Sequence, residues 1–293
     1  MRLYKVQDQL KAGEYMFDPG VSMEKVLEDL ISGRSVLQAI TFPEGLTSQQ
    51  IVDRLNADPV LTGTIAGVPE EGALMPDTYK FTRGTTRQQI IDQMKRAQER
   101  AVAEVWERRS PDLPVDTPEE LVTLASIVEK ETGKADERPR VAAVFINRLR
   151  EGMRLQSDPT IVYGIFGGAG KPADRPILQS DIDRETPYNT YRVSGLPPTP
   201  IANPGKAALE AVANPSRTDE IYFVADGTGG HAFATSLEDH NRNVARWRRI
   251  EATQGEAQGE AGATTAPPAG TDADTPATPP AAGAEEQGAA VEP

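Results

Sequence analysis

The sequence predicts an α+β protein with a small N-terminal module and a larger second domain, joined by one long helix. Strand-like and helical patterns alternate over the first 60 residues or so. A charged, amphipathic pattern from about Thr86 to Arg108 indicates the connecting helix. A helix-start signature at Thr117 then opens the second domain. We therefore divide the chain into residues 1–80, a helical connector 81–111, an α+β domain 112–251 and a tail 252–293.

The N-terminal module is predicted from turn and cap residues placed between short apolar runs. Ser22 and Thr47 each precede a helical pattern as N-caps, and Gly33 ends the first of these helices. Strands are expected on either side of the first helix. The expected order is strand 14–17, helix from 22, strand 36–42 and helix from 47. The chain enters this module at Met1 without a turn or cap signal, so we expect a natural start further upstream.

The second domain begins with the firmest local signal in the chain. Thr117-Pro118-Glu119-Glu120 combines an N-cap, a proline at the first helical position and a capping-box glutamate. A second helix is expected over 137–150. Loops rich in Pro, Gly and Asn follow, then a strand over 220–225 and a final helix from about 236 to 250.

Composition excludes several classes of function. The chain of 293 residues has no Cys, which removes thiol chemistry and disulfides, and its net charge of −13 argues against nucleic acid as a partner. Residues 252–293 contain acids but no bases and are mostly Ala, Pro, Gly and Thr, which predicts a disordered C-terminal tail. The two histidines of the chain lack the spacing of zinc ligands, and its glycine-rich loops lack the spacing of nucleotide-binding motifs. We therefore expect no metal and no cofactor.

One carboxylate interrupts the apolar face of the helix that starts at Thr117. At about 100° per residue, Glu131 falls between Leu124 and Ile127, whereas Lys130 points to the opposite side. Glu129 falls nearer the rim of the apolar stripe. A carboxyl in apolar surroundings has a raised pKa, as a general acid near neutral pH requires. The alternative is a helix-end glutamate paired with Lys or Arg.

Several blocks of sequence resemble one family in order and in register. They are Leu124–Thr132, Val141–Leu149, Gly152–Thr160, Pro187–Tyr191, Gly195–Pro198, Ile201–Gly205, Tyr222–Ala225 and Gly229–His231. Together they are similar to the endolytic murein transglycosylases, also called YceG-like proteins. The resemblance runs from about Leu10 to Ile250 and implies a LysM-like fold for the N-terminal module. Thr199 departs from it, because the family usually has Gly after the two prolines.

The resemblance implies an activity and assigns Glu131 as the catalytic residue. Glu131 would protonate the glycosidic oxygen between MurNAc and GlcNAc and then take the proton of the MurNAc C6 hydroxyl, leaving 1,6-anhydro ends. Peptidoglycan strands are the implied partner, with synthases as further partners and termination of strand elongation as the role. The family also carries an N-terminal membrane anchor and works at the periplasmic face of the inner membrane. This sequence lacks that anchor, so the chain is expected to begin late.

Polar and aromatic residues of the matching blocks are candidates for binding the sugar chain. The candidates are Gln156, Asp158, Thr160, Tyr163, Tyr188, Asn189, Tyr191 and His231. Ser157-Asp158-Pro159-Thr160 is equally a turn or cap signal, and Tyr163 and Tyr191 suit a core equally well. Two other functions stay open: a scaffold that binds glycan without cutting it, and a hydrolase that leaves reducing ends.

Overall fold

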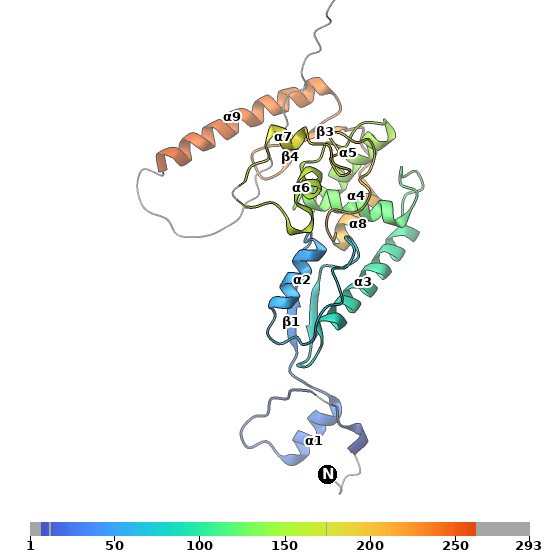
Figure 1. The fold of residues 1–293 in the computed structure, drawn as a ribbon, viewed down its shortest axis with the longest axis vertical. Helices are drawn as coiled ribbons and strands as arrows, with labels where there is room; N and C mark the ends of the chain where they lie inside the picture. Colours follow the sequence, from blue (N-terminus) through green and yellow to red (C-terminus); the bar gives the residue numbers. More distant parts are fainter. Residues whose placement is uncertain (1–6, 12, 174, 262–293) are drawn as a thin grey trace, which may run out of the picture.

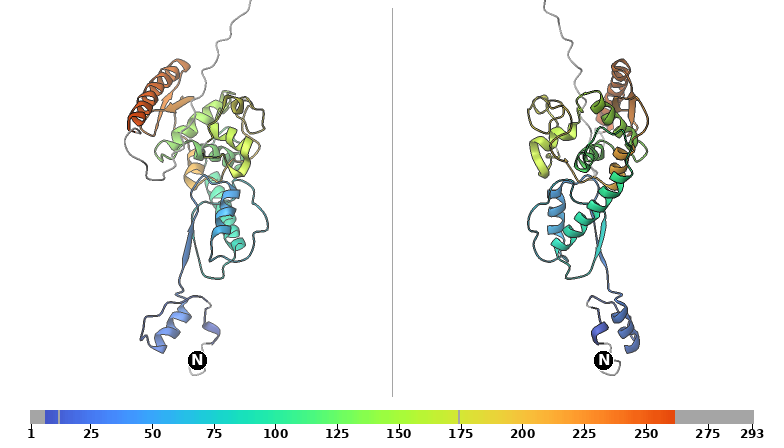
Figure 2. Two further views of the ribbon diagram at one scale, coloured as in Figure 1. Left: turned by 60° about the vertical axis from the view of Figure 1, so that its left-hand side comes forward. Right: turned by 90° about the vertical axis from the view of Figure 1, so that its right-hand side faces the viewer.

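The computed structural model describes residues 7–11, 13–173 and 175–261, with side chains to Thr253. Figure 1 shows an elongated arrangement with three parts along its long axis. The segment with α1 (Met23–Ser32) lies at one end, the unit with β1 and α2 in the middle, and the larger domain at the other end. The two views of Figure 2 keep the same order.

The segment around α1 has little buried surface. Ser22 caps α1 through the Lys25 N–H, and Gly33 ends the helix in the left-handed conformation at φ 75°, as predicted. No residue of α1 is buried. The predicted strand over 14–17 was wrong: residue Glu14 accepts one backbone bond from Val36, at 2.6 Å, and no ladder forms. The 3-10 helix η1 (Gln7–Gln9) precedes this segment.

The middle unit is a two-stranded sheet flanked by helices. β1 (Gln38–Thr41) pairs antiparallel with β2 (Thr78–Phe81), and α2 (Ser48–Ala57) lies between them in sequence. Thr47 and Gln50 form the capping box of α2. Ile51 and Leu55 of α2 are fully buried beneath the sheet, so this unit has a core of its own.

Helix α3 (Arg87–Glu107) contributes to two cores at once. Ile90, Ile91 and Met94 near its start are buried in the core of the middle unit. Ala101 and Val105 near its end are buried in the core of the larger domain. The predicted connector is therefore a shared structural element, and Figure 2 shows it running between the two parts.

The larger domain packs α4 (Pro118–Glu131), α5 (Arg138–Arg150) and α8 (Lys206–Ala213) into one core. The antiparallel hairpin of β3 (Tyr222–Ala225) and β4 (His231–Ala234) packs against α5 and α9 (Leu237–Ala261). The α+β class is confirmed. Sequence patterns missed β4 and the short helical elements α6 (Asp158–Phe166), η2 (Gly167–Ala169), α7 (Gln179–Ile182) and α8.

Asn203 joins the larger domain to the middle unit. It is fully buried, and its Oδ1 accepts the Leu74 N–H at 2.9 Å. Its amide nitrogen donates to the Leu46 carbonyl and the Ser48 hydroxyl, each at 3.1 Å. Buried bonds of this kind are costly to leave unmade, so they fix the middle unit against the loop before α8.

The C-terminal helix is longer than expected. The prediction ended it near Ile250, whereas α9 continues to Ala261. The rest of the predicted tail lies outside the described residues. Within the part of the chain that the structure describes, no helix combines the length and apolar character needed to cross a bilayer.

Candidate active site

Helix α4 delivers Glu131 as its last residue. Thr117 caps the helix through the Glu120 N–H, and Pro118 occupies the first turn, as predicted. The eight residues 121–128 are all buried, Thr123 and Ser126 among them, so protein surrounds this part of the helix on all sides. Lys130 is exposed, whereas Glu131 is partly covered. The helix therefore ends with a carboxyl turned into protein.

The carboxyl of Glu131 is held by a hydroxyl group. Ser157 Oγ donates a hydrogen bond to Glu131 Oε1 at 2.5 Å. Burial raises the pKa of Glu131 to about 7, while the Ser157 bond lowers it, the Asp158 charge raises it and the Arg148 charge lowers it. Among the described residues, no cation forms an ion pair with Glu131. A carboxylic acid in this setting is half-protonated near neutral pH.

Arg148 is the cation whose charge acts on Glu131, but its donors serve other groups. Its Nε donates to the Ile221 carbonyl at 2.7 Å and its Nη1 to the Leu155 carbonyl at 2.6 Å. Burial lowers the pKa of Arg148. Arg148 therefore braces β3 and the loop before α6, and sequence patterns gave no signal for this role.

Asp158, the first residue of α6, is the second carboxyl of the cluster. Its Oδ1 accepts a hydrogen bond from the Tyr191 hydroxyl at 2.7 Å. Burial raises the pKa of Asp158, and the Tyr191 bond lowers it. Tyr191 itself has a raised pKa through burial and the Asp158 charge. The structure thus brings together three residues predicted from sequence: Glu131, Asp158 and Tyr191.

The loop that carries Ser157 is strained and fixed by threonines. Gln156 has φ 53°, the one positive φ among the described non-glycine residues, and it is exposed. Ser157 N donates to Thr190 Oγ1 at 2.9 Å, and Thr160 Oγ1 bonds the Ser157 carbonyl at 2.6 Å. Thr160 is fully buried. Its place in the structure is therefore that of a brace for the Ser157 loop.

Ser157 is the site residue that sequence patterns missed. It stands at the N-cap position of α6, where a serine hydroxyl usually accepts a helix N–H. Its side chain makes no such bond and points to Glu131 instead. The only available signal was its position between two candidate residues, Gln156 and Asp158. The sequence Ser157-Asp158-Pro159-Thr160 is, however, equally typical of a helix cap.

Three further candidates, Tyr163, Tyr188 and Asn189, make contacts that hold the fold together. Tyr163 and Tyr188 pack edge to face with ring centroids 4.9 Å apart, and the Tyr188 hydroxyl bonds Thr199 at 2.7 Å. Thr199, unusual by the family resemblance, thus has a specific partner. Asn189 is buried, with its amide nitrogen bonded to the carbonyls of Ile182 and Arg184.

His231 lies on the β3–β4 hairpin and contacts the loop after α4. Its Nδ1 is 2.8 Å from Glu137 Oε2, and its ring packs edge to face on Phe223. These contacts link it to Glu137 and the aromatic cluster of the hairpin, and none of them reaches Glu131. Within the described chain, no group of three or more His, Cys, Asp or Glu residues has the arrangement of a metal site.

Glu129, two residues before Glu131 on the same helix, is bonded to groups of two other helices. Its Oε2 accepts the Gly205 N–H at the start of α8 at 2.9 Å, and Arg138 Nη2 lies 3.5 Å from its Oε1. Burial raises the pKa of Glu129; Gly205 lowers it, Glu44 raises it, and Arg138 lowers it. Glu129 thus has the cation partner that Glu131 lacks, and it links α4, α5 and α8.

The fold and this site define a class: an α+β domain in which a partly buried carboxylic acid accepts a hydrogen bond from a hydroxyl group and forms no ion pair within the described residues. Such an acid can give a proton near neutral pH and, once ionised, take one back. The sequence pattern of the YceG-like family matches residues 1–246, and the chain belongs to that family.

Relatives and a solved structure agree with this assignment. An endolytic murein transglycosylase of Streptococcus pneumoniae is 34% identical over 83% of this chain and 51% of its own length. An endolytic murein transglycosylase of Bacillus subtilis is 29% identical over 82% of this chain and 73% of its own. A crystal structure of a putative yceG-like protein from Listeria monocytogenes superposes with a TM-score of 0.57 at 31% identity, covering 82% of this chain and 87% of that one. The chain spans about half the length of the pneumococcal relative.

Proposed function

We propose that this chain carries the catalytic part of an endolytic lytic transglycosylase of peptidoglycan. The observation that supports this most is the carboxyl of Glu131, which is partly buried, accepts a hydrogen bond from Ser157 and forms no ion pair with any described residue, with its pKa raised to about 7. The relatives named endolytic murein transglycosylases supply the substrate class. The proposed product is a 1,6-anhydro-MurNAc end formed within a nascent strand.

In the proposed reaction, one carboxyl handles both proton transfers. Protonated Glu131 gives its proton to the glycosidic oxygen as the bond from MurNAc C1 breaks, which frees the GlcNAc O4 as a hydroxyl. The resulting carboxylate then takes the proton of the MurNAc C6 hydroxyl while O6 bonds to C1. Glu131 ends protonated, so no water is consumed and the acid is ready for another cycle.

Ser157 and Asp158 have opposite effects on this acid. The Ser157 hydroxyl donates to the carboxyl and favours its ionised form, whereas the Asp158 charge favours the protonated form. The threonine braces around Ser157 keep this donor in place, which preorganises the carboxyl. We infer that Thr160 acts through the loop, and that Gln156, exposed beside Ser157, faces the substrate.

A route with a single carboxyl fits the surroundings better than hydrolysis. Hydrolytic glycosidases use a second carboxylate as nucleophile or to activate water. The nearest candidate, Asp158, has Oδ1 bonded by Tyr191 and a pKa raised by burial. A scaffold that only binds glycan would gain nothing from a buried acid, because an uncompensated carboxyl costs stability.

The family relationship supports several finer proposals. We propose a place in the cell envelope, at the periplasmic face of the inner membrane, where nascent strands are made, and a role in ending strand elongation. Synthases are proposed partners. The LysM-like character of residues 1–80 stays a prediction. In this part of the chain β1 pairs with β2, α2 lies between them in sequence, and residues 14–17 form no strand.

Mass analysis of purified peptidoglycan after digestion tests the proposal. The wild-type protein should produce muropeptides ending in 1,6-anhydro-MurNAc, each lighter by one water than a hydrolytic product. Glu131→Gln should produce none. Glu119→Gln is the matched control, since Glu119 lies exposed on the same helix and receives the same substitution. Reducing ends would show a hydrolase, and no new ends with wild-type protein would show a binder; either result contradicts the proposal.

A further inference from the structure

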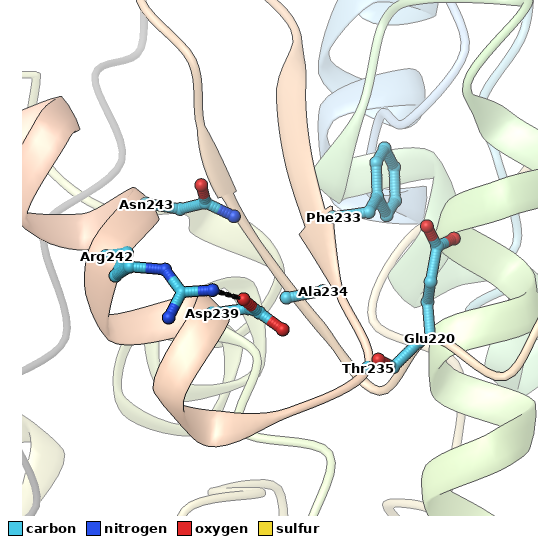
Figure 3. Close-up of a pocket in the computed structure, with 7 residues that line it drawn as sticks. All are labelled: Glu220, Phe233, Ala234, Thr235, Asp239, Arg242 and Asn243. Atoms are coloured by element: carbon cyan, nitrogen blue, oxygen red, sulfur yellow. Dashed lines mark hydrogen bonds and ion pairs between the residues drawn. The ribbon is translucent and has the colours of Figure 1, made fainter.

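A hollow lies on the larger domain, between the end of the β3–β4 hairpin and α9. It has a volume of about 410 Å³ and opens to solvent. Residues 233–235 form one wall, Asp239, Arg242 and Asn243 of α9 form the other, and Glu220 closes one end (Figure 3). None of Glu131, Ser157, Asp158 or Tyr191 lines it, so it is separate from the cluster described above.

The charges in this hollow are already paired within the protein. Glu220 forms an ion pair with Arg140, which lowers the pKa of the Glu220 carboxyl. Asp239 forms an ion pair with Arg242, drawn as a dashed line in Figure 3. A site with balanced, paired charges suits neither a metal cation nor a phosphate group, since each requires an excess of opposite charge. The hollow therefore fits a neutral ligand.

Two uncharged polar side chains remain for such a ligand. The Asn243 amide and the Thr235 hydroxyl line the hollow, and neither has a hydrogen-bond partner among the described residues. Figure 3 shows Asn243 extending from α9 toward the hairpin. An amide offers two donors and one acceptor, and a hydroxyl offers one donor and accepts as well. Phe233 and Ala234 add apolar surface beside them. Hydroxyls, an acetamido group and an apolar ring face on one ligand would match this lining.

One side chain bonds both the backbone next to the hollow and the backbone next to the Ser157 loop. Arg148 donates to the carbonyl of Ile221, the residue after Glu220, and to the carbonyl of Leu155, two residues before Ser157. The charge of Arg148 also acts on Glu131.

We propose that this hollow is a second saccharide subsite, which holds an N-acetylated amino sugar of the glycan strand away from the bond that is cleaved. The inference rests on the proposed function, because it takes a glycan strand as the ligand. Its role is to hold a polymer in register, so that cleavage falls within a strand. Short glycans that do not reach the hairpin would not use it.

Binding of an oligomer of β-1,4-linked N-acetylglucosamine to the full chain tests this subsite. The measurements are titration calorimetry and backbone amide shifts, made in the Glu131→Gln background so that nothing is cut. Thr235→Ala combined with Asn243→Ala should weaken binding about tenfold, as expected for two lost hydrogen bonds. Asn241→Ala is the matched control, because Asn241 is exposed on the same helix and does not line the hollow.

The outcomes separate this inference from the proposed function. Amide shifts at residues 231–236 that vanish in the double variant, with the control unchanged, support the subsite. Affinity of the double variant within about twofold of the control, or no shifts at the hairpin, overturns it. Anhydro ends produced by the wild-type protein test the function independently. Alanine favours helix at position 243, so misfolding is not expected to mask the result.

Discussion

Replacing Glu131 by Gln should stabilise the protein at alkaline pH. The pKa of Glu131 rises from its usual value of 4.5 to about 7 on folding, mainly through burial. An acid with a raised folded pKa is neutral in both states at low pH, so it costs nothing there. As pH rises from 4.5 to 7, the unfolded chain loses its proton first, and the folded state is progressively disfavoured.

The size of the effect follows from the pKa. Each pH unit of difference corresponds to about 1.4 kcal/mol, so the ionisable group costs about 3 kcal/mol above pH 7. Glutamine keeps an oxygen to accept the Ser157 hydrogen bond and never ionises. The variant should therefore be more stable than the wild type by about 3 kcal/mol at pH 8 and equal to it near pH 4.

Urea unfolding at pH 4, 6 and 8 measures this difference directly. Glu119→Gln serves as the control, since Glu119 is exposed and its substitution should leave the free energy of unfolding unchanged to within about 0.5 kcal/mol at each pH. The reasoning is refuted if Glu131→Gln shows the same difference at pH 4 and pH 8. It is also refuted if the variant is less stable than the wild type at pH 8.

Other substitutions test the surroundings of this acid and the contact between the middle unit and the larger domain. Ser157→Ala removes the donor that favours the ionised carboxyl, so the alkaline limb of the pH–rate profile should move to higher pH; an unchanged limb would exclude Ser157 from the site. Asp158→Asn removes a nearby negative charge and should move the same limb to lower pH, with a shift upward as the contrary result. Glu129→Gln should retain at least part of the cleavage activity, because Glu129 is bonded to Gly205 and Arg138 and makes no contact with Ser157; complete loss of activity in a folded protein would contradict the assignment. Asn203→Ala should lower the free energy of unfolding by about 2 to 4 kcal/mol in urea titrations, since it leaves the Leu74 N–H buried without an acceptor, and a neutral effect would contradict its role.

The sequence was most informative where local chemistry determines structure. Helix starts at Ser22, Thr47 and Thr117 all form as predicted, because a capping side chain satisfies nearby N–H groups. The rotation of Glu131 onto the apolar side of α4 could be worked out from spacing alone. Spacing alone could not show whether Glu131 has an ion-pair partner, because its neighbours Ser157 and Arg148 come from other elements of the chain.

Predictions failed where structure depends on partners far along the chain. The run at residues 14–17 has strand-forming residues but no strand to pair with, so it stays irregular. Helices α6 and α8 were hidden among Pro, Gly and Asn, whose turn signals dominate the local pattern. The role of α3 as a shared element was also hidden, since its apolar residues divide between two cores.

The ionisation of Glu131 in the intact protein is the most direct test of the central claim. With carbon-13 label in the glutamate carboxyls, NMR spectra recorded from pH 3 to 9 give each titration curve, and the resonance absent from Glu131→Gln identifies this residue. An inflection near pH 7 is predicted, in line with the pKa of about 7. An inflection near 4.5, the ordinary value for glutamate, would show a solvated carboxylate and contradict the assignment of Glu131 as the proton donor.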